Sequence, residues 1–400
     1  MDTFGEALRT MREAAGWSLS ALAHRASVSK SLLGMLETRQ RTPTADIAGA
    51  VDRALQAGGV LTELAATERG GDDMRRRALL ATVGAAASLG TIGGPHALGD
   101  LVRHGLLDAA GSEEDWDAVA DDCARRLVTD PSPLLGSALL TNLMILKQQL
   151  AEKPSKSLLR SAANLGQTYG LWLGNGGELG GANHWYRSCS QLAERSGDNS
   201  MLAYTLGRSA SRGCYEDWTV QRTLDTAAAA LDVTSRPTLG GLEAHAARVG
   251  VYALTKDAAA GRAALQDMAE VAEQLPAGGQ TGPGPRERLA FLAAFFECRA
   301  GSLDDATAAC IEAEPILATS PTWWIETQVY WARAMVAAGD VRGGLAYALQ
   351  AIGRCQHDVR VIRVAARDVC QAVPGGYRGD DLAALWQYAD RSPGPWETLR

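Results

Sequence analysis

The sequence predicts an all-α protein with more than one domain. Three observations lead to this fold class: alanine dominates the apolar residues, aromatic residues make up only 6% of the chain, and apolar residues recur at helical spacing between Gly, Pro, Asp and Asn breaks. Close-packed helices use small apolar residues, whereas sheets favour β-branched and aromatic residues. A chain of 400 residues with 46% hydrophobic side chains is also long enough to bury several cores.

The net charge of −7, from 39 basic and 46 acidic residues, gives the chain no broad positive field for nucleic acid or anionic lipid. Any contact with DNA is therefore expected to be local. The cysteines are odd in number, scattered and never in a C-x-x-C pair, so we assign them no function and expect a cytoplasmic protein. They are Cys123, Cys189, Cys214, Cys298, Cys310, Cys355 and Cys370.

The first domain is expected at residues 1–68 as a series of short helices. Apolar residues recur on one helical face between Phe4 and Ala15. Ser18 then caps a second helix, and a tight turn leads into a third helix over residues 29–37. Two short helices joined so closely must cross at a steep angle. This pattern predicts a helix-turn-helix, whose second helix enters a DNA major groove.

The run WSLSALAHRASVSKSLLGMLETRQRTPT, continued by ADIAGAVDRALQAGGVLTEL, resembles a helix-turn-helix domain of the Cro and lambda-repressor type, the XRE family. The resemblance covers about 65 residues. It implies that Ser18 and Ser29 cap the second and third helices. It also implies that Ala23 lies at the tight contact between helices and Val28 in the turn.

Two further positions bear on the resemblance. Arg12 and Glu37 match a basic and acidic pair that ties the first helix to the end of the third in this family. Leu19 departs from the pattern, because the family often has Gln there, contacting the DNA backbone and first bases. One expected DNA contact is therefore missing.

Positive charge gathers around the predicted recognition helix. Residues 25–41 contain four basic residues and one acid, Glu37. We expect Lys30 and Ser31 to contact base edges, with Gly34 allowing close approach, and the neighbouring basic groups to contact phosphates. The predicted DNA-binding residues are Ser18, Ser20, Ser29, Lys30, Ser31, Gly34, Arg39 and Arg41. The alternative is a charged surface loop on a structural helical domain.

A connector is predicted at residues 69–112. Arg75, Arg76 and Arg77 precede an uncharged stretch that ends at Gly94, which is similar to a twin-arginine export signal. Such signals are N-terminal, whereas this one follows a complete domain. The stretch is also too poor in large apolar side chains for a membrane span, so we expect an interdomain connector and no membrane contact.

Residues 113–400 are predicted to form a second, all-helical domain with internal repeats. A Gly turn followed by small residues recurs, with the small position at 182, 219, 261, 306 and 344. This resembles the tetratricopeptide repeat, although the steps exceed its usual length of about 34 residues. A solenoid of helical hairpins is therefore expected, with its first helices lining a concave groove.

Projecting the repeat register onto those first helices places nine residues toward the groove. They are Asn164, Gln167, Thr205, Arg208, Arg212, Arg288, Phe291, Glu326 and Arg333. The arginines suit a carboxylate or phosphate, and the two amides suit a peptide backbone. The alternative is that each arginine is solvated or paired with an acid on a neighbouring turn.

Catalytic and metal-binding motifs were sought and not found in the sequence. It contains no G-x-x-x-x-G-K-[ST], H-E-x-x-H or G-x-S-x-G pattern, and its six histidines lie far apart. We therefore expect no enzyme, no cofactor and no metal.

The whole arrangement resembles a large group of actinobacterial transcriptional regulators. The resemblance implies a cytoplasmic regulator that binds double-stranded DNA as a homodimer, with repeats that sense a peptide, small molecule or protein. The alternative is a scaffold protein whose repeats bind a protein and whose first domain binds DNA weakly or not at all. The scaffold alternative stays open because residues 1–70 carry eight basic and eight acidic groups, and so have no net positive charge to attract DNA.

Overall fold

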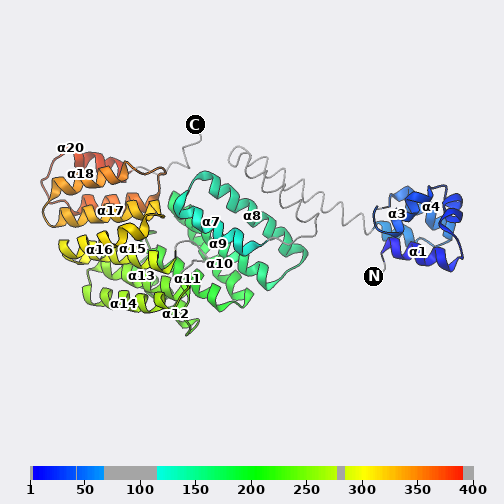
Figure 1. Ribbon diagram of the computed structural model, residues 1–400, viewed down its shortest axis with the longest axis horizontal. Coiled ribbons are helices and arrows are strands. Elements are labelled where there is room, and N and C mark those ends of the chain that lie inside the picture. The colour runs from blue at the N-terminus through cyan, green and yellow to red at the C-terminus, as the bar shows by residue number, and fades with distance from the viewer. Residues whose placement is uncertain (1–2, 42, 67–114, 277–283, 391–400) are drawn as a thin grey trace. The chain divides into compact units, whose positions relative to one another are not determined.

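The computed structural model describes residues 3–41, 43–66, 115–276 and 284–390. Every regular element among them is a helix, which confirms the all-α prediction. Contacts divide the chain into two compact units, Met1–Ser88 and Leu89–Arg400, called here the N-terminal and C-terminal units. Figure 1 shows the helices of each. The predicted connector, with its Arg75–Gly94 stretch, lies outside the described residues.

The N-terminal unit is a small bundle around an apolar centre. Its helices are α1 (Phe4–Ala14), α2 (Leu19–Ala26), α3 (Lys30–Glu37) and α4 (Ala45–Leu55), and residues 60–66 are also helical. Each of the four begins at a Ser or Thr whose side chain accepts a backbone N–H of the first turn. Gly5 lets α1 approach α3, because a Cβ there would lie 2.5 Å from the carbonyl oxygen of Leu36.

The C-terminal unit consists of consecutive helices packed in pairs, as in a helical solenoid. Among the described residues of this unit, two helices come first and six hairpins follow, in which α9 packs on α10, α11 on α12, and so on to α19 on α20. The helices are α7 (Trp116–Thr129), α8 (Pro133–Glu152), α9 (Lys156–Gly176), α10 (Leu179–Ser196), α11 (Asn199–Gly213), α12 (Val220–Asp232), α13 (Leu239–Thr255), α14 (Ala258–Glu273), α15 (Pro285–Ala300), α16 (Leu303–Leu317), α17 (Pro321–Ala337), α18 (Val341–Ile352), α19 (Arg360–Ala372) and α20 (Asp380–Ala389).

Small residues allow the two helices of each hairpin to approach. The fourth residue of the second helix is small and buried in five hairpins: Ala182, Thr223, Gly261, Ala306 and Gly344. A Cβ on Gly344 would lie 2.7 Å from the carbonyl oxygen of Ala332. The predicted position 219 is therefore wrong by one turn, since Thr219 is the N-cap of α12 and Thr223 takes the buried place.

The solenoid closes on itself through α7. The Thr322 hydroxyl, at the start of α17, donates to the Val128 carbonyl near the end of α7 at 3.2 Å, across 194 residues. His357 Nε2 lies 3.0 Å from Asp130 Oδ1, just after α7. Val128 also belongs to the hydrophobic cluster of helices α13–α20. Helix α7, the first described helix of the unit, is thus joined to α17 and to His357 by polar and apolar contacts.

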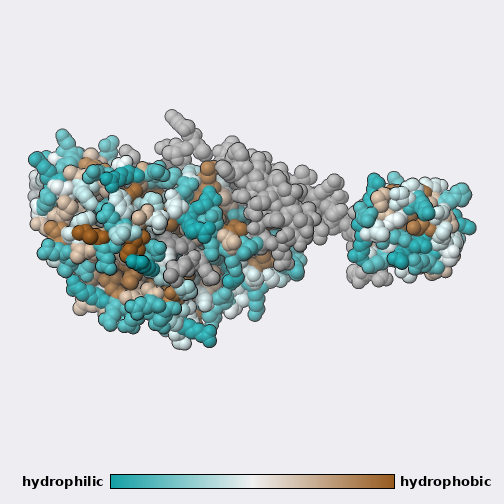
Figure 2. All heavy atoms as spheres, viewed as in Figure 1, coloured by the Kyte–Doolittle hydropathy of each residue, from teal (hydrophilic) through white to brown (hydrophobic). Residues whose placement is uncertain are grey.

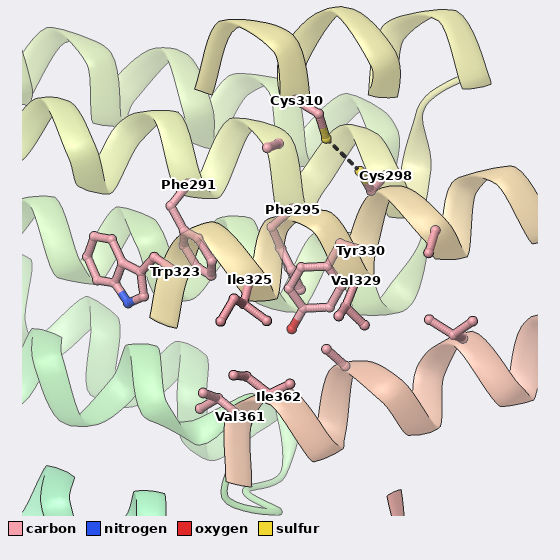
Figure 3. Close-up of a cluster of buried hydrophobic side chains, with 14 of the residues drawn as sticks. Phe291, Phe295, Cys298, Cys310, Trp323, Ile325, Val329, Tyr330, Val361 and Ile362 are labelled. Carbon is pink, nitrogen blue, oxygen red and sulfur yellow. Dashed lines mark hydrogen bonds between the residues drawn. The ribbon is translucent and has the colours of Figure 1, made fainter. Parts of the chain in front are cut away.

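Part of this hydrophobic cluster is shown in Figure 3. Rings from α15 and α17 fill its centre, and the Sγ atoms of Cys298 and Cys310 lie 3.5 Å apart within it as free thiols. Burial raises the pKa of Cys298 well above its ordinary value. Both units present mainly hydrophilic residues on the face seen in Figure 2. No described helix is long and apolar enough to cross a membrane.

Candidate functional site

Three serines define the two ends of α2 and the start of α3. Ser18 Oγ accepts the Ala21 N–H at 3.2 Å, and Ser29 Oγ accepts the Leu32 N–H at 3.2 Å. Ser27 lies between them in the left-handed region with φ 55°, which stops α2. These local bonds fix the direction in which α3 leaves the turn, as the two predicted caps require.

The recognition helix α3 buries one face and exposes the other. Leu33 and Leu36 are buried in the core of the unit. Lys30 and Ser31 are exposed on the first turn, and Gly34 is half-buried, with no heavy atom within 4 Å of where its Cβ would be. The predicted base-contacting residues therefore share an open face, which is the placement that major-groove contact requires.

The predicted pair between Arg12 and Glu37 is confirmed. Arg12 Nε donates to Glu37 Oε1 at 2.6 Å and Arg12 Nη2 to Glu37 Oε2 at 2.9 Å, a two-pronged contact. The hydrogen bond to Glu37 raises the pKa of Arg12. Glu37 is the one acid of residues 25–41, and its side chain is only 8% exposed. Its charge is therefore directed inward, away from the surface of the recognition helix.

The basic residues around α3 lie on the surface. Arg39 and Arg41 are exposed, and Arg39 adopts φ 59° and pairs with Glu6 of α1. Arg25 stacks on Trp17, 4.4 Å from the ring centroid. The T-x-x-E pattern at the start of α1 identifies a cap, but it does not disclose that Glu6 faces Arg39.

Two residues of α2 differ in their surroundings. Ser20 is exposed and available to a phosphate. Leu19, which stands where the resembling family often has Gln, is half-buried and packs on the core of the N-terminal unit. Its side chain contributes to stability in this chain.

The nine residues predicted to line a groove all lie on first helices of hairpins, α9, α11, α15 and α17. Seven are buried, and Arg208 and Arg333 are half-buried. Five line one small, partly enclosed cavity: Arg208, Arg212, Arg288, Phe291 and Glu326. The other four, Asn164, Gln167, Thr205 and Arg333, are not part of its lining.

Glu243 of α13 joins two of these arginines, and sequence reasoning missed it. Its carboxylate accepts from Arg208 at 3.2 Å and from Arg288 at 2.8 Å, and the Ser211 hydroxyl donates to it at 2.8 Å. Burial alone raises the pKa of Glu243, but the two guanidinium groups outweigh burial and hold it below its usual value. Helix position gave no signal, because Glu243 lies 35 and 45 residues from its partners.

The other predicted cations and the buried acid also have partners. Arg212 Nε donates to Glu216 Oε1 at 3.0 Å, and Arg333 Nε lies 2.9 Å from Asp368 Oδ2. The Tyr330 hydroxyl donates to Glu326 at 3.0 Å, yet burial raises the pKa of Glu326 to about 7. No group of three or more His, Cys, Asp or Glu side chains in the described ranges is placed to hold a metal ion.

A known protein family matches the N-terminal part of the chain. Residues 3–65 match the family described as a helix-turn-helix domain. The N-terminal unit carries a DNA-binding fold. No curated protein and no solved structure matches the chain. The helix-turn-helix match indicates DNA binding and transcriptional regulation.

Proposed function

We propose that this protein is a sequence-specific DNA-binding transcriptional regulator of the Cro and lambda-repressor type, which acts as a cytoplasmic homodimer. The observation that carries the proposal is the open face of α3. Lys30 and Ser31 are exposed in its first helical turn, directly after the N-cap Ser29. Base edges are read from such a face, and phosphates are held by the flanking Arg39 and Arg41.

The proposal assigns DNA binding to residues 1–68, connection to 69–112 and sensing to 113–400. In this division the C-terminal unit is a tetratricopeptide-like domain that binds an effector and mediates dimerisation. A dimer places two recognition helices on half-sites about one helical turn apart, so a palindromic operator is expected. The six consecutive hairpins and their buried polar residues support the sensing role.

The test is selection of bound sequences from a random DNA pool by the full-length protein, followed by titrations on the enriched site. Lys30→Ala should weaken binding to that site by about 1–3 kcal/mol and relax preference at one base pair. Arg41→Ala should weaken all sequences alike and flatten the salt slope by about one unit.

Arg53→Ala is the matched control, because it removes an exposed cation from α4 of the same unit. We expect it to leave the preferred sequence unchanged. A pool that shows no enrichment, or equal effects of Lys30→Ala and Arg41→Ala on specific and random DNA, would contradict the proposal. The scaffold role would then be favoured.

A further inference from the structure

A small cavity lies inside the C-terminal unit, where side chains from six helices meet. It is lined by residues of α7, α9, α11, α15, α17 and α19. Its volume is about 30 Å³, room for one or two water molecules. Sites for organic ligands are about ten times larger. A ligand of that size therefore enters only if part of the wall moves.

One side of the cavity carries polar atoms that the fold leaves unpaired. Arg212 Nη2 and Asn175 Oδ1 are buried and have no hydrogen-bond partner among the described residues. Both residues are only 7% exposed, and both line the cavity. A buried polar group without a partner costs free energy, and a charged group costs more. The unpaired guanidinium N–H of Arg212 can donate to a carboxylate, whereas the unpaired Asn175 Oδ1 can only accept.

Two aromatic rings also line the cavity. Phe291 of α15 and Trp323 of α17 are stacked with ring centroids 5.1 Å apart, and Figure 3 shows the two rings together, with Val361 of α19 in the same cluster. Arg288 lies 5.3 Å from the Trp323 centroid while paired with Glu243. The cavity thus combines polar and apolar lining residues, which suits an amphipathic molecule.

The charge of the lining and its direct partners favours an anion. Three arginines, Arg208, Arg212 and Arg288, face two carboxylates that pair with them, Glu216 and Glu243. The third carboxyl, Glu326, holds its proton up to about neutral pH, because burial raises its pKa to about 7. The cluster therefore carries one surplus positive charge below that pH. A monoanion neutralises it, whereas a phosphate dianion exceeds it.

The movable part of the wall is the C-terminal end of α7. Leu127 and Val128 line the cavity from this side. They are held by the Thr322 hydroxyl on the Val128 carbonyl and by the His357 contact with Asp130, whose side chain is 52% exposed. These two polar contacts and the packing of Val128 in the hydrophobic cluster hold this wall segment. In the chain, α7 is also the first described helix after residues 67–114, which lead back to the DNA-binding unit.

We propose that this cavity binds a small organic carboxylate with an apolar body, whose carboxylate accepts from Arg212 Nη2 beside Asn175 and whose apolar body displaces Leu127 and Val128. The end of α7 is the lid of the site, and its displacement is the signal to the N-terminal unit. This assignment rests on the proposed regulatory function and names its effector class. The ligand's apolar body and the side chains of Leu127 and Val128 would occupy the same space. Binding therefore shifts the population of the protein toward the conformation in which the end of α7 is displaced.

The first test is calorimetric titration of the full-length protein without DNA, so that its outcome does not depend on DNA binding. Benzoate and isovalerate are the probes. Benzyl alcohol lacks the charge, acetate lacks the apolar body, and inorganic phosphate has a different geometry. We expect benzoate or isovalerate to bind with one site per chain, and the three control compounds to bind at least about 10-fold more weakly.

Variants locate the site. Asn175→Asp brings a negative charge to the polar lining of the cavity, and Arg212→Lys keeps the charge beside Glu216 but loses the unpaired N–H. Each should weaken carboxylate binding by about 10- to 100-fold. Arg212→Lys alters a buried pair, so thermal melting is measured for both variants, and Asn175→Asp carries the test if Arg212→Lys fails to fold.

The lid is tested by Thr322→Val, which removes the hydroxyl that holds α7 and keeps the side-chain shape. It should raise carboxylate affinity by about 2- to 10-fold. Thr255→Val is the matched control, because Thr255 also donates to a backbone carbonyl, but within α13. It should leave affinity unchanged. Binding by neither carboxylate to wild type or Thr322→Val, or binding unaffected by Asn175→Asp, would overturn the assignment. Neither result would bear on DNA binding.

Discussion

Both units bury some charge, including Glu37 and Asp52 in the N-terminal unit, but they differ in the exposure of the cations proposed to bind a partner. In the N-terminal unit the centre is apolar, and the basic residues Arg25, Lys30 and Arg41 are all exposed. In the C-terminal unit charged side chains lie inside, on the first helices of the hairpins, where Glu243 and Arg288 are less than 10% exposed. A surface that meets DNA needs accessible cations, whereas a buried ion pair contributes through its partners and surroundings.

The two units also differ in the sequence separation of the contacts that stabilise them. The caps of α1 to α4 join residues three apart, so each helix start is encoded in a short stretch of sequence. In the C-terminal unit, the pairs of Glu243 with Arg208 and Arg288 join different hairpins. The first unit is therefore expected to tolerate changes in the second, and buried charges in the second to be sensitive to the loss of one partner.

The largest expected effect is at Glu243. Glu243→Gln removes the charge that two buried arginines share, so it should lower the free energy of unfolding of the C-terminal unit by about 3–5 kcal/mol. Asp267→Asn is the control, since Asp267 also pairs with an arginine, Arg248, but is 43% exposed. It should cost less than about 1 kcal/mol. Hydrogen exchange resolved by peptide measures both units, and equal losses for the two variants would remove the contrast.

A smaller effect is expected at Glu326, and it depends on pH. Burial raises its pKa in the folded protein to about 7, from an ordinary value of 4.5. The folded state therefore binds the proton more tightly, so this stabilisation is full below pH 4.5 and is lost as the pH rises through about 7. The Glu326→Gln side chain cannot ionise. The free energy of unfolding of this variant, relative to that of wild type, should therefore rise by about 2–3 kcal/mol between pH 5 and pH 8. Denaturation curves that keep a constant offset across this range would contradict the prediction.

The smallest of the three effects tests the N-terminal unit. Glu37→Gln loses the charge on the two-pronged contact with Arg12, and we expect a cost of about 1.5–3 kcal/mol, confined to peptides of α1 to α4. Glu13→Gln is the control for an exposed contact, because Glu13 pairs with both Arg9 and Arg12 but is 54% exposed. Hydrogen exchange of the C-terminal unit should be unchanged by both. Slower or faster exchange there would show that the two units are coupled in stability.

The sequence predicts much of the N-terminal unit because its signals are local. Ser18 and Ser29 cap helices within three residues, and the resemblance implies the Arg12 to Glu37 contact that the structure contains. Placement of the nine groove residues on first helices also follows from repeat register. Register places residues along a helix. Register does not identify which residue pairs with which. Glu243 is 35 and 45 residues from Arg208 and Arg288, separations that no helical period predicts.

The remaining features depend on how the hairpins stack. The shift from Thr219 to Thr223 arises because the turn before α12 is longer than the turns within the α9, α13, α15 and α17 hairpins, and a small residue alone does not identify its register. The contact of Val128 with Thr322 spans 194 residues, so no local sequence pattern predicts it. Which arginines share one cavity is likewise decided by the curvature of the whole unit.

The closure of the C-terminal unit through α7 also fixes the number of hairpins. In an open repeat array each hairpin contacts only its neighbours, so the array frays from its ends and tolerates gain or loss of a repeat. Here the contact of Thr322 with Val128 ties the start to a late hairpin. Deleting or inserting one hairpin between them would carry α17 away from α7. Such a contact also forms late during folding, because it requires closure of a long chain segment, so the unit is expected to fold slowly and unfold cooperatively.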